Sequence, residues 1–410
     1  MVIFMDMKCQ VCSSESLHEV MDMGHHPPSD SFLTKEELDK PETLYPLKLF
    51  MCNSCSLVQL SHAVDPKILF TEKFIYRTGY SNALKKDLQE MIGDIVKRFG
   101  VNQGDFVVDI GSNDGTMLGF YPHGVRVLGV DPSSVADIAI QNGVPTIKDF
   151  FNENLSKQIS EKHGKAKVIT STNTFAHVKD IWSLMNGIKA LLGEKGVFVQ
   201  GSHYFLDMVE KMQHDEIYLE HLRYYSVESL VNLFKHFGMD VFYAKKMRTH
   251  GGSIVTAACL KGEYPIDTSV DALIKEEKTF GLHSKDVLGK FKSNAFRNRA
   301  ELVSLLHKIK KDGKKVVGIG AAAKGVSLLN FCKIGPELVD YIVERSDLKI
   351  GKFTPGMHIP IIDEKVLFED QPEYALLLAW NLKDDLIPKL RGFGYKGKFI
   401  LPNPAVEVIE

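Results

Sequence analysis

Four of the six cysteines form two pairs with the same spacing, Cys9 with Cys12 and Cys52 with Cys55. Two residues between cysteines let both thiolates of a pair face one ion, and two pairs complete a tetrahedral shell of four sulfurs. Zinc is the usual ion for such a shell, and four thiolates leave no open position for chemistry. We therefore predict a structural zinc at these cysteines, with free or redox-active thiols as the alternative.

A second group of polar residues follows two short apolar runs in the middle of the chain. The second run ends at Asp131, and the first ends in a glycine-rich turn that holds Asp109, Gly111, Asn113, Asp114 and Gly115. Glycines let a backbone approach a ligand closely, and an acid that closes the second strand can bind both hydroxyls of a ribose. Because the turn lacks the G-x-G-x-x-G fingerprint, a dinucleotide is disfavoured. The pattern predicts a nucleotide-binding α/β sheet.

This turn resembles the first motif of the class I S-adenosylmethionine methyltransferases. The resemblance implies that S-adenosylmethionine is the cofactor and that Asp131 binds its ribose. It also implies an acidic residue at the adenine edge, the position of Asp149. The predicted cofactor-binding residues are Asp109, Gly111, Asn113, Asp114, Gly115, Asp131, Pro132, Asp149, Phe150 and Asn173. The alternative is a Rossmann-like domain that binds another adenosine ligand.

Residues 213–226 place Tyr218, Glu220 and His221 within four positions. Together with the cysteine pairs and residues 173–177 (Asn-Thr-Phe-Ala-His), this segment resembles the bacterial sugar C-methyltransferases, which methylate a carbon of a nucleotide-linked 4-keto-deoxysugar. Residues 70–76, 248–253, 318–325 and 349–360 resemble further parts of the same family in the same order. Leu219 stands where the family usually has a second histidine, and residues 200–203 replace an acidic, proline-containing loop.

The resemblance implies that Tyr76, His177, Tyr218, Glu220 and His221 are the catalytic residues. A proton next to a ketone is removed by a side chain when the resulting enolate is stabilised, and histidine is the natural base near neutral pH. We assign this role to His221. Glu220 is expected to bind a sugar hydroxyl, because neighbours in an extended segment point to opposite faces. The other three side chains would hold the sugar or donate to the enolate oxygen.

The expected fold class is α/β, and three units are expected to position these residues. They are a small zinc-binding domain (1–66), a class I methyltransferase Rossmann-like domain (67–258) and a second Rossmann-like α/β domain (259–410). Apolar residues at helical spacing predict a helix over residues 84–99 that precedes the strands of the middle unit. In the C-terminal unit, a strand enters a turn of small residues with Lys324, which is either a site for the substrate's pyrophosphate or a packing turn.

The composition limits the choice of partner. In 410 residues, Lys and Arg number 50 and Asp and Glu 52, a net charge of −2, which argues against bulk affinity for nucleic acid. No apolar run approaches the ~18–20 residues of a membrane span, and no secretory signal is visible, so a cytoplasmic location is expected. The expected partner is a nucleotide-diphosphate-linked keto-sugar rather than nucleic acid or a membrane. The oligomeric state is open, with a monomer compatible with the sequence.

Three other functions are compatible with parts of the sequence. A zinc-module methyltransferase acting on nucleic acid or another small molecule shares the cysteines and the glycine-rich turn, but predicts a basic surface. A dinucleotide-dependent oxidoreductase would need a fingerprint that residues 318–325 do not give. A non-catalytic nucleotide-sugar binding protein would not need the set of Tyr76, Tyr218 and His221.

Overall fold

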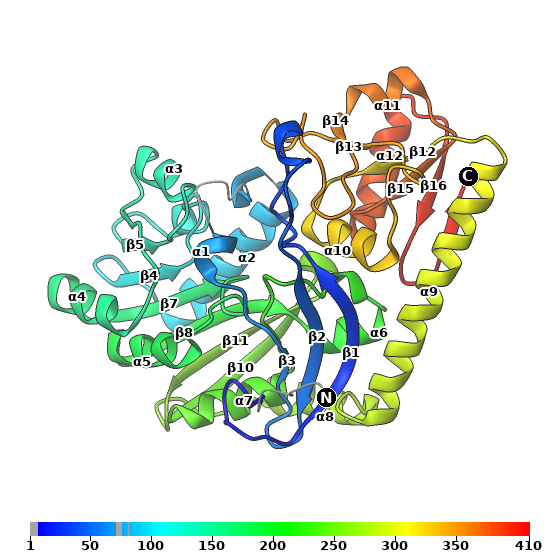
Figure 1. Cartoon of the computed structure of the whole chain (residues 1–410). Helices are drawn as coiled ribbons and strands as arrows, with labels where there is room; N and C mark the ends of the chain where they lie inside the picture. The colour runs from blue at the N-terminus through cyan, green and yellow to red at the C-terminus, as the bar shows by residue number, and fades with distance from the viewer. Residues whose placement is uncertain (1–6, 71–75, 81) are drawn as a thin grey trace.

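The computed structural model describes residues 7–70, 76–80 and 82–410, and within them the chain forms three β-sheets (Figure 1). The N-terminal sheet has the order β1-β2-β3-β9 and is antiparallel throughout. Its strands are β1 (Leu17–His26), β2 (Tyr45–Cys52), β3 (Val58–Leu60) and β9 (Arg223–Tyr224). The last of these comes from the middle of the chain, so the N-terminal sheet is completed by a strand that begins two residues after His221.

The middle sheet has the order β10-β11-β8-β7-β4-β5-β6, with β11 antiparallel to both of its neighbours. Its strands are β4 (Phe106–Ile110), β5 (Arg126–Val130), β6 (Thr146–Ile147), β7 (Ala166–Thr172), β8 (Leu192–His203), β10 (Met239–Met247) and β11 (Ser253–Leu260). Its helices are α1 (Pro66–Leu69), α2 (Asn82–Phe99), α3 (Ala136–Gln141), α4 (Glu153–His163), α5 (Ile181–Leu191), α6 (Phe205–Glu210) and α7 (Val227–His236).

The C-terminal sheet has the order β14-β13-β12-β15-β16-β17, parallel up to β16 and antiparallel at β17. Its strands are β12 (Val316–Ile319), β13 (Ile342–Glu344), β14 (Ile361–Asp363), β15 (Tyr374–Leu377), β16 (Lys398–Leu401) and β17 (Glu407–Ile409). The helices that follow β11 in the chain are α8 (Thr268–Phe280), which packs against β10 and α7, then α9 (Lys285–Lys311), α10 (Ala323–Cys332), α11 (Lys365–Asp370) and α12 (Lys383–Gly392). Short 3-10 turns are η1 (Lys35–Glu37), η2 (Thr78–Tyr80), η3 (Leu118–Phe120), η4 (His214–Glu216), η5 (Thr249–Gly251) and η6 (Trp380–Leu382).

The apolar patterns explain these elements. Every residue of β4 is buried, as expected for a parallel strand that is covered on both faces. In α2, Leu88, Met91, Ile92 and Ile95 are buried on one face, at the spacing that predicts the helix over residues 84–99. The predicted α/β fold class is therefore confirmed in the middle and C-terminal sheets.

We propose that the three sheets are the cores of three domains. The predicted boundary at residue 258 falls inside β11, which continues to Leu260, and the boundary at residue 66 falls at the first residue of α1. In Figure 1 the strands of the N-terminal sheet lie between the middle sheet and the C-terminal sheet. The long helix α9 runs along one side of the molecule and packs against β1, β12 and α10.

The N-terminal and C-terminal parts also meet through their loops. Leu33 forms an antiparallel bridge with Phe353. The carboxylate of Glu42 accepts hydrogen bonds from the backbone of Gly356 and bonds Nε2 of His358. No helix among the described residues is long and apolar enough to cross a membrane.

Arg223 provides a test of how β9 is held. Its guanidinium, which is 1% exposed, donates to the carbonyl oxygens of Val178 and Lys179 at 2.6 and 3.2 Å. In Arg223→Met these carbonyls lose their donors inside the protein, at a cost of about 1–3 kcal/mol each. We expect urea titration to show a loss of several kcal/mol of unfolding free energy. Arg126→Met is the control, because it removes an exposed hydrogen bond to the carbonyl oxygen of His163. It should change the free energy of unfolding by about 0.5 kcal/mol or less.

Candidate active site and zinc centre

The four paired cysteines converge on one point of the N-terminal sheet. Sγ of Cys9 lies 3.6 Å from Sγ of Cys55, Sγ of Cys12 lies 3.5 Å from Sγ of Cys52, and all four sulfurs lie within 4.8 Å of one another. A tetrahedral zinc with Zn–S bonds of about 2.3 Å separates its sulfurs by roughly 3.8 Å, so the donor set fits this ion. None of the four is in a disulfide. The two turns that hold the cysteine pairs, which we call the zinc knuckles, share one local structure. Ser13 and Ser56 each have a positive φ, and their backbone N–H groups donate to the carbonyl oxygens of Cys9 and Cys52.

The glycine-rich turn follows β4 at the carboxyl edge of the middle sheet. Gly111 has φ of +76°, and a Cβ placed there would lie 2.0 Å from Oγ1 of Thr174, so the turn requires glycine. Asn113 uses its side chain to bond the backbone of Tyr76 and Thr78, and Asp114 accepts from the backbone of Gly79. These two predicted cofactor residues thus tie the segment around Tyr76 to the turn.

Two buried carboxylates, those of Asp109 and Asp131, lie at the ends of β4 and β5 next to this turn. The carboxylate of Asp131 follows β5 and accepts from the backbone of Asn113 at 2.9 Å and from the hydroxyl of Ser133 at 2.6 Å. Asp109 accepts from the hydroxyl of Thr170 at 2.6 Å, and burial raises its pKa to about 7, with the nearby charge of Asp131 acting in the same direction. Asp131 thus lies at the end of β5, the position that the sequence prediction gives to a ribose acid, whereas the carboxylate of Asp109 is bonded to Thr170 of the neighbouring strand β7.

The remaining predicted cofactor residues border the same edge. Asp149 and Phe150 are exposed beyond β6, and Pro132 is half-buried next to Asp131. Asn173 follows β7 with φ of +53° and donates its N–H to the carbonyl of Gly201.

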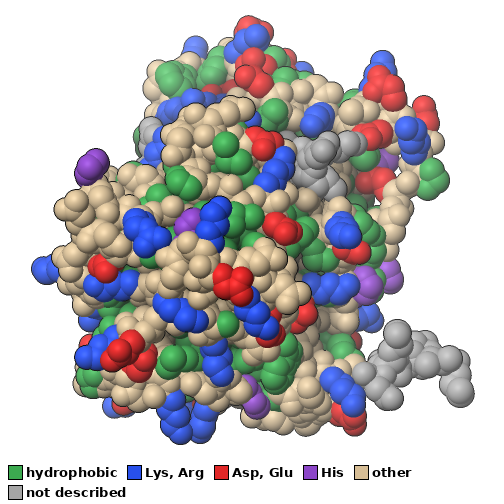
Figure 2. All heavy atoms as spheres, turned by 90° about the vertical axis from the view of Figure 1, so that its left-hand side faces the viewer, with side chains coloured by type: hydrophobic (Ala, Val, Ile, Leu, Met, Phe, Trp, Pro, Cys, Tyr) green, Lys and Arg blue, Asp and Glu red, His purple; other side chains and the backbone are tan. Residues whose placement is uncertain are grey.

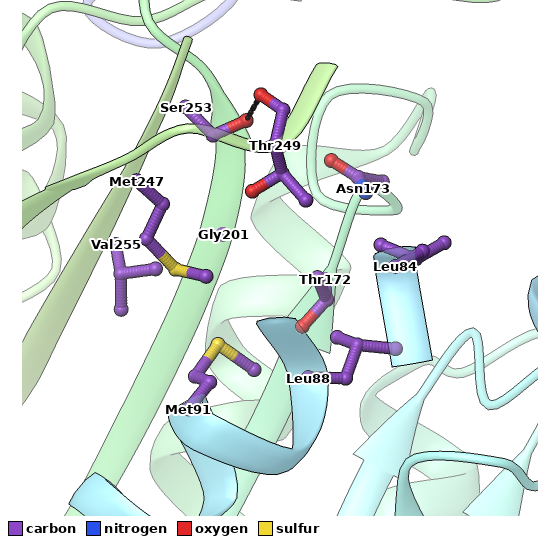
Figure 3. A pocket seen from close by; sticks show the side chains of 10 residues that line it. All are labelled: Leu84, Leu88, Met91, Thr172, Asn173, Gly201, Met247, Thr249, Ser253 and Val255. Carbon is purple, nitrogen blue, oxygen red and sulfur yellow. Dashed lines mark hydrogen bonds between the residues drawn. The ribbon is translucent and has the colours of Figure 1, made fainter. Parts of the chain in front are cut away.

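A pocket beside this edge, shown in Figure 3, lies between α2 and the ends of β7, β8, β10 and β11. It is lined by Leu84, Leu88, Met91, Thr172, Asn173, Gly201, Met247, Thr249, Ser253 and Val255. Its lining is mostly apolar, and at its rim the hydroxyl of Ser253 donates to the carbonyl of Thr249.

Three predicted catalytic residues meet in a cluster of aromatic rings. The ring of His221, which is 3% exposed, lies 4.1 Å from that of Tyr218 and 4.7 Å from that of His177, centroid to centroid. The hydroxyl of Tyr218 lies 2.9 Å from Nε2 of His221, and Nδ1 of His221 lies 3.4 Å from the carbonyl oxygen of Glu216. Because a carbonyl only accepts, this contact favours the tautomer with the proton on Nδ1, in which Nε2 is the acceptor nitrogen.

His177 is held in the same way. Its Nδ1 donates to the carbonyl oxygen of Glu220 at 2.6 Å, and its ring makes an edge contact with Phe70. Burial lowers the pKa of His177 to about 4, so its imidazole is neutral at physiological pH. Nε2 of this ring is again the acceptor.

The side chain of Glu220 points away from these rings, toward the N-terminal domain. Its carboxylate accepts from the backbone of Ser29 at 2.7 Å and of Asp30 at 3.4 Å. Burial, together with the nearby carboxylate of Asp30, raises the pKa of Glu220 to about 8. Its Oε2 is buried and lacks a hydrogen-bond partner among the described residues, so a polar ligand group would satisfy it.

Tyr76 lies at the outer side of the site. Although 42% of the residue is exposed, desolvation and the carboxylates of Asp30 and Asp114 raise the pKa of its hydroxyl to about 12. Residues 71–75 of the segment predicted to present this tyrosine lie outside the described residues.

The structure adds His203 and Glu216, which the sequence prediction missed, and it gives Lys324 a contact that the prediction did not include. The ring of His203, at the end of β8, packs against that of His221 with a centroid distance of 4.7 Å and a tilt of 50° between the planes, and its Nε2 lies 3.3 Å from Oε2 of Glu216. Nζ of Lys324, the candidate pyrophosphate ligand, is buried and donates to Oε1 of Glu216 at 3.0 Å. The one available signal for His203 was its position at the end of a strand of the methyltransferase unit.

Comparison with known proteins identifies the family. A zinc-binding domain model matches residues 9–70, a methyltransferase domain model matches residues 84–244, and a C-methyltransferase C-terminal domain model matches residues 248–404. C-methyltransferase NovU of Streptomyces niveus is 33% identical over 406 residues, which cover 98% of this chain and 96% of NovU. The chain belongs to the C-methyltransferase family.

Two solved structures resemble a part of the chain. An S-adenosylmethionine-dependent methyltransferase of Clostridium acetobutylicum is 15% identical, with 43% of this chain and 92% of that chain covered and a TM-score of 0.34. Magnesium protoporphyrin IX methyltransferase of Synechocystis is 12% identical, with 43% and 80% covered and a TM-score of 0.32.

This membership confirms both predicted cofactors and the predicted fold class. The middle unit has the Rossmann-like fold of the class I methyltransferases, which binds S-adenosylmethionine, and the N-terminal unit is a zinc-binding domain with a four-cysteine cluster. The roles of the individual residues in cofactor binding and catalysis stay predictions.

The zinc centre predicts one zinc ion per chain by elemental analysis of the purified protein. Cys52→Ser should lose the ion and lower the free energy of unfolding, because the bound metal stabilises the folded state. Cys259→Ala, which changes a buried cysteine of β11, should keep one zinc per chain. Zinc retained in full by Cys52→Ser would contradict the four-sulfur site.

The buried carboxyl of Asp109 predicts a pH effect on stability. Its pKa is raised from 3.8 to about 7 in the folded state, so between these values the folded protein holds a proton that the unfolded chain has released. The free energy of unfolding therefore falls as pH rises, by roughly 2 kcal/mol between pH 5.5 and 7.5. Asp109→Asn should remove this part of the slope in urea titrations, whereas the surface variant Asp137→Asn should retain it.

Proposed function

We propose that this C-methyltransferase methylates the carbon next to the ketone of a nucleotide-linked 4-keto-deoxysugar, at C3, with His221 as the base. The observation that supports the proposal is the buried cluster of His221, Tyr218 and His177 beside the glycine-rich turn. Methylation of carbon requires a carbon nucleophile, and loss of a proton next to a ketone produces one.

The hydrogen bonds of His221 support its role as the proton acceptor. The backbone carbonyl of Glu216 keeps the proton on Nδ1, so Nε2 is free of a proton and faces the hydroxyl of Tyr218. In the proposed reaction Nε2 takes the proton from the substrate carbon while Tyr218 moves its hydroxyl to the enolate oxygen. Burial, with the carboxylates of Glu216 and Glu220 nearby, raises the pKa of Tyr218 well above its usual value, so this hydroxyl acts as a donor.

S-adenosylmethionine supplies, when bound, a methyl group made electrophilic by the sulfonium. We assign its ribose to Asp131 at the end of β5, and the turn at Gly111 requires glycine because a Cβ there would meet the side chain of Thr174. The protein's contribution is then alignment of the substrate carbon with that methyl group.

Two further side chains support a sugar as the substrate. Neutral His177 offers Nε2 as an acceptor for a hydroxyl. The buried Oε2 of Glu220, whose side chain is directed toward Ser29, offers a second polar contact. The Lys, Arg, Asp and Glu side chains are interspersed on the face shown in Figure 2, which is a suitable surface for a small substrate rather than a polyanion.

The proposal is tested by proton exchange in D2O. The enzyme is incubated without S-adenosylmethionine with thymidine- or guanosine-diphosphate-linked 4-keto-6-deoxyhexoses, and deuterium at C3 is followed by NMR. We expect the parent protein to exchange this proton. His221→Asn should slow exchange by a factor of about 10² or more, because the base is lost.

His307→Asn, an exposed change on α9, is the matched control and should exchange at the parent rate. Binding of S-adenosylmethionine to His221→Asn, measured by calorimetry, should be unchanged. Parental exchange by His221→Asn would show that another group is the base, and failure of the parent on every keto-sugar would reject the substrate class.

A further inference from the structure

Asp30, in the loop that follows β1, lies next to the side chain of Glu220. Glu220 is 4% exposed, and its Oε1 accepts from the backbone of Ser29 at 2.7 Å and of Asp30 at 3.4 Å. Its Oε2 is buried and has no hydrogen-bond partner among the described residues. A buried polar atom of this kind is unfavourable unless a bound group satisfies it.

The carboxylate of Asp30 is a second acceptor at this place. Asp30 is half-buried, and its side chain makes no hydrogen bond or ion pair with any residue that the structure describes. Lys349 of the C-terminal part acts on it only at longer range, because the ammonium donates to the carbonyl oxygen of Ala321 at 2.7 Å. Asp30 therefore presents an unpaired carboxylate beside Glu220.

The charge of Asp30 acts on three of the predicted catalytic residues. Burial is the main cause that raises the pKa of Tyr76, Tyr218 and Glu220, and the carboxylate of Asp30 adds to it in each case. Because the interaction between charges falls with distance, this carboxylate lies near all three side chains. The backbone of Tyr76 in turn accepts from the side chain of Asn113 in the glycine-rich turn. Asp30 thus borders the candidate site on the side of the N-terminal domain.

The pairing of two acids determines what they can bind. Burial and the charge of Asp30 raise the pKa of Glu220 to about 8, and burial raises the pKa of Asp30 against the charge of Lys349. Two carboxyl groups in such a place favour the state that holds one proton, which offers one donor and several acceptors. A hydroxyl group can both donate and accept, whereas an ammonium group only donates.

We infer that Asp30 and Glu220 bind one hydroxyl group of the sugar, so that the N-terminal domain supplies a part of the substrate site. This inference rests on the proposed function, because it requires a sugar substrate. The hydroxyl donates to the ionised carboxylate and accepts from the protonated carboxyl group. These bonds form with the substrate and persist in the transition state, so Asp30 determines affinity and specificity more than rate.

A divalent cation is the competing occupant of two neighbouring acids. Neither of the two clusters of His, Cys, Asp and Glu ligand atoms found among the described residues includes Asp30 or Glu220. Calcium and magnesium require about six or more oxygen ligands, and two backbone N–H groups already bind Oε1 of Glu220. The arrangement therefore favours a hydroxyl over a metal ion.

The subsite is tested by calorimetric binding to the zinc-loaded full chain without S-adenosylmethionine. The ligands are the thymidine- or guanosine-diphosphate-linked 4-keto-6-deoxyhexose that the parent protein exchanges, and its 2-deoxy and 3-deoxy analogues. Loss of the recognised hydroxyl should weaken binding to the parent about 10- to 100-fold, as for a hydrogen bond to a charged group. Asp30→Ala should weaken binding of the complete sugar by a similar factor and bind the deoxy analogue as the parent does, because both changes remove one interaction.

Two further variants separate binding from folding. Asp39→Ala changes an exposed acid of the same domain and should bind every sugar with the parental affinity. Asp30→Asn should keep one zinc per chain and, without ligand, unfold at the same or a higher urea concentration than the parent, because an unpaired carboxylate is removed. In the D2O exchange assay, Asp30→Ala should raise KM and leave the rate at saturating substrate close to that of the parent.

Several results would overturn the inference. They are an equal effect of Asp30→Ala on all three sugars, unfolding of Asp30→Asn at a lower urea concentration, and tighter binding of an analogue with an amino group in place of the hydroxyl. A second divalent ion per chain that is lost in Asp30→Asn would show that the acids hold a metal.

The failure of the two proposals can be distinguished. A parent protein that exchanges no keto-sugar would reject the proposed substrate and this subsite with it. A parent that exchanges a keto-sugar, with Asp30→Ala binding it equally well, would reject the subsite alone.

Discussion

The site depends on the burial of one polar loop. Residues 213–226 run through the centre of the molecule, and all are buried except the half-buried Tyr218. A buried charge is costly unless it is paired, so each ionisable side chain of this loop must find a partner inside the protein. Glu216 finds Lys324 of the C-terminal domain, Glu220 finds the backbone of the N-terminal domain at Ser29, and Arg223 finds carbonyls after β7. The loop thereby requires that all three parts of the chain be assembled around it.

Local patterns were sufficient for the parts of the site that short motifs define. The cysteine spacing specified the zinc knuckles, and the glycine at position 111 specified a turn that no side chain can enter. The cluster of Tyr218 and His221 was also predictable, because the two residues are three positions apart in a segment that resembles a known family. The partners of these residues were not predictable in the same way. Ser29 lies 191 positions from Glu220 and Lys324 lies 108 positions from Glu216, and no sequence period connects such pairs.

The contacts that Lys324 and His203 make with Glu216 show why the type of a single residue was a poor guide to its role. Lysine near a turn of small residues suggested an anion from solvent, but the anion it contacts is the chain's own Glu216. His203 ends a strand of twelve residues, and nothing in its immediate sequence distinguishes it from a packing residue. Its environment arises because β8, η4 and α10 come together, and that juxtaposition follows from the packing of two α/β units. Which partner a buried charged side chain meets is therefore decided by the assembled fold.

The zinc ion, which takes no part in the proposed chemistry, still bears on the catalytic loop through the backbone. Cys52 ends β2 and Cys55 precedes β3, so the metal fixes the turn between these strands. Strand β3 pairs with β9, with Val58 opposite Tyr224 and Gln59 opposite Arg223. Because β9 begins two residues after His221, the register of that pairing constrains the position of the backbone at His221. A structural metal can thus influence the base through two strands of hydrogen bonds, without contacting cofactor or substrate.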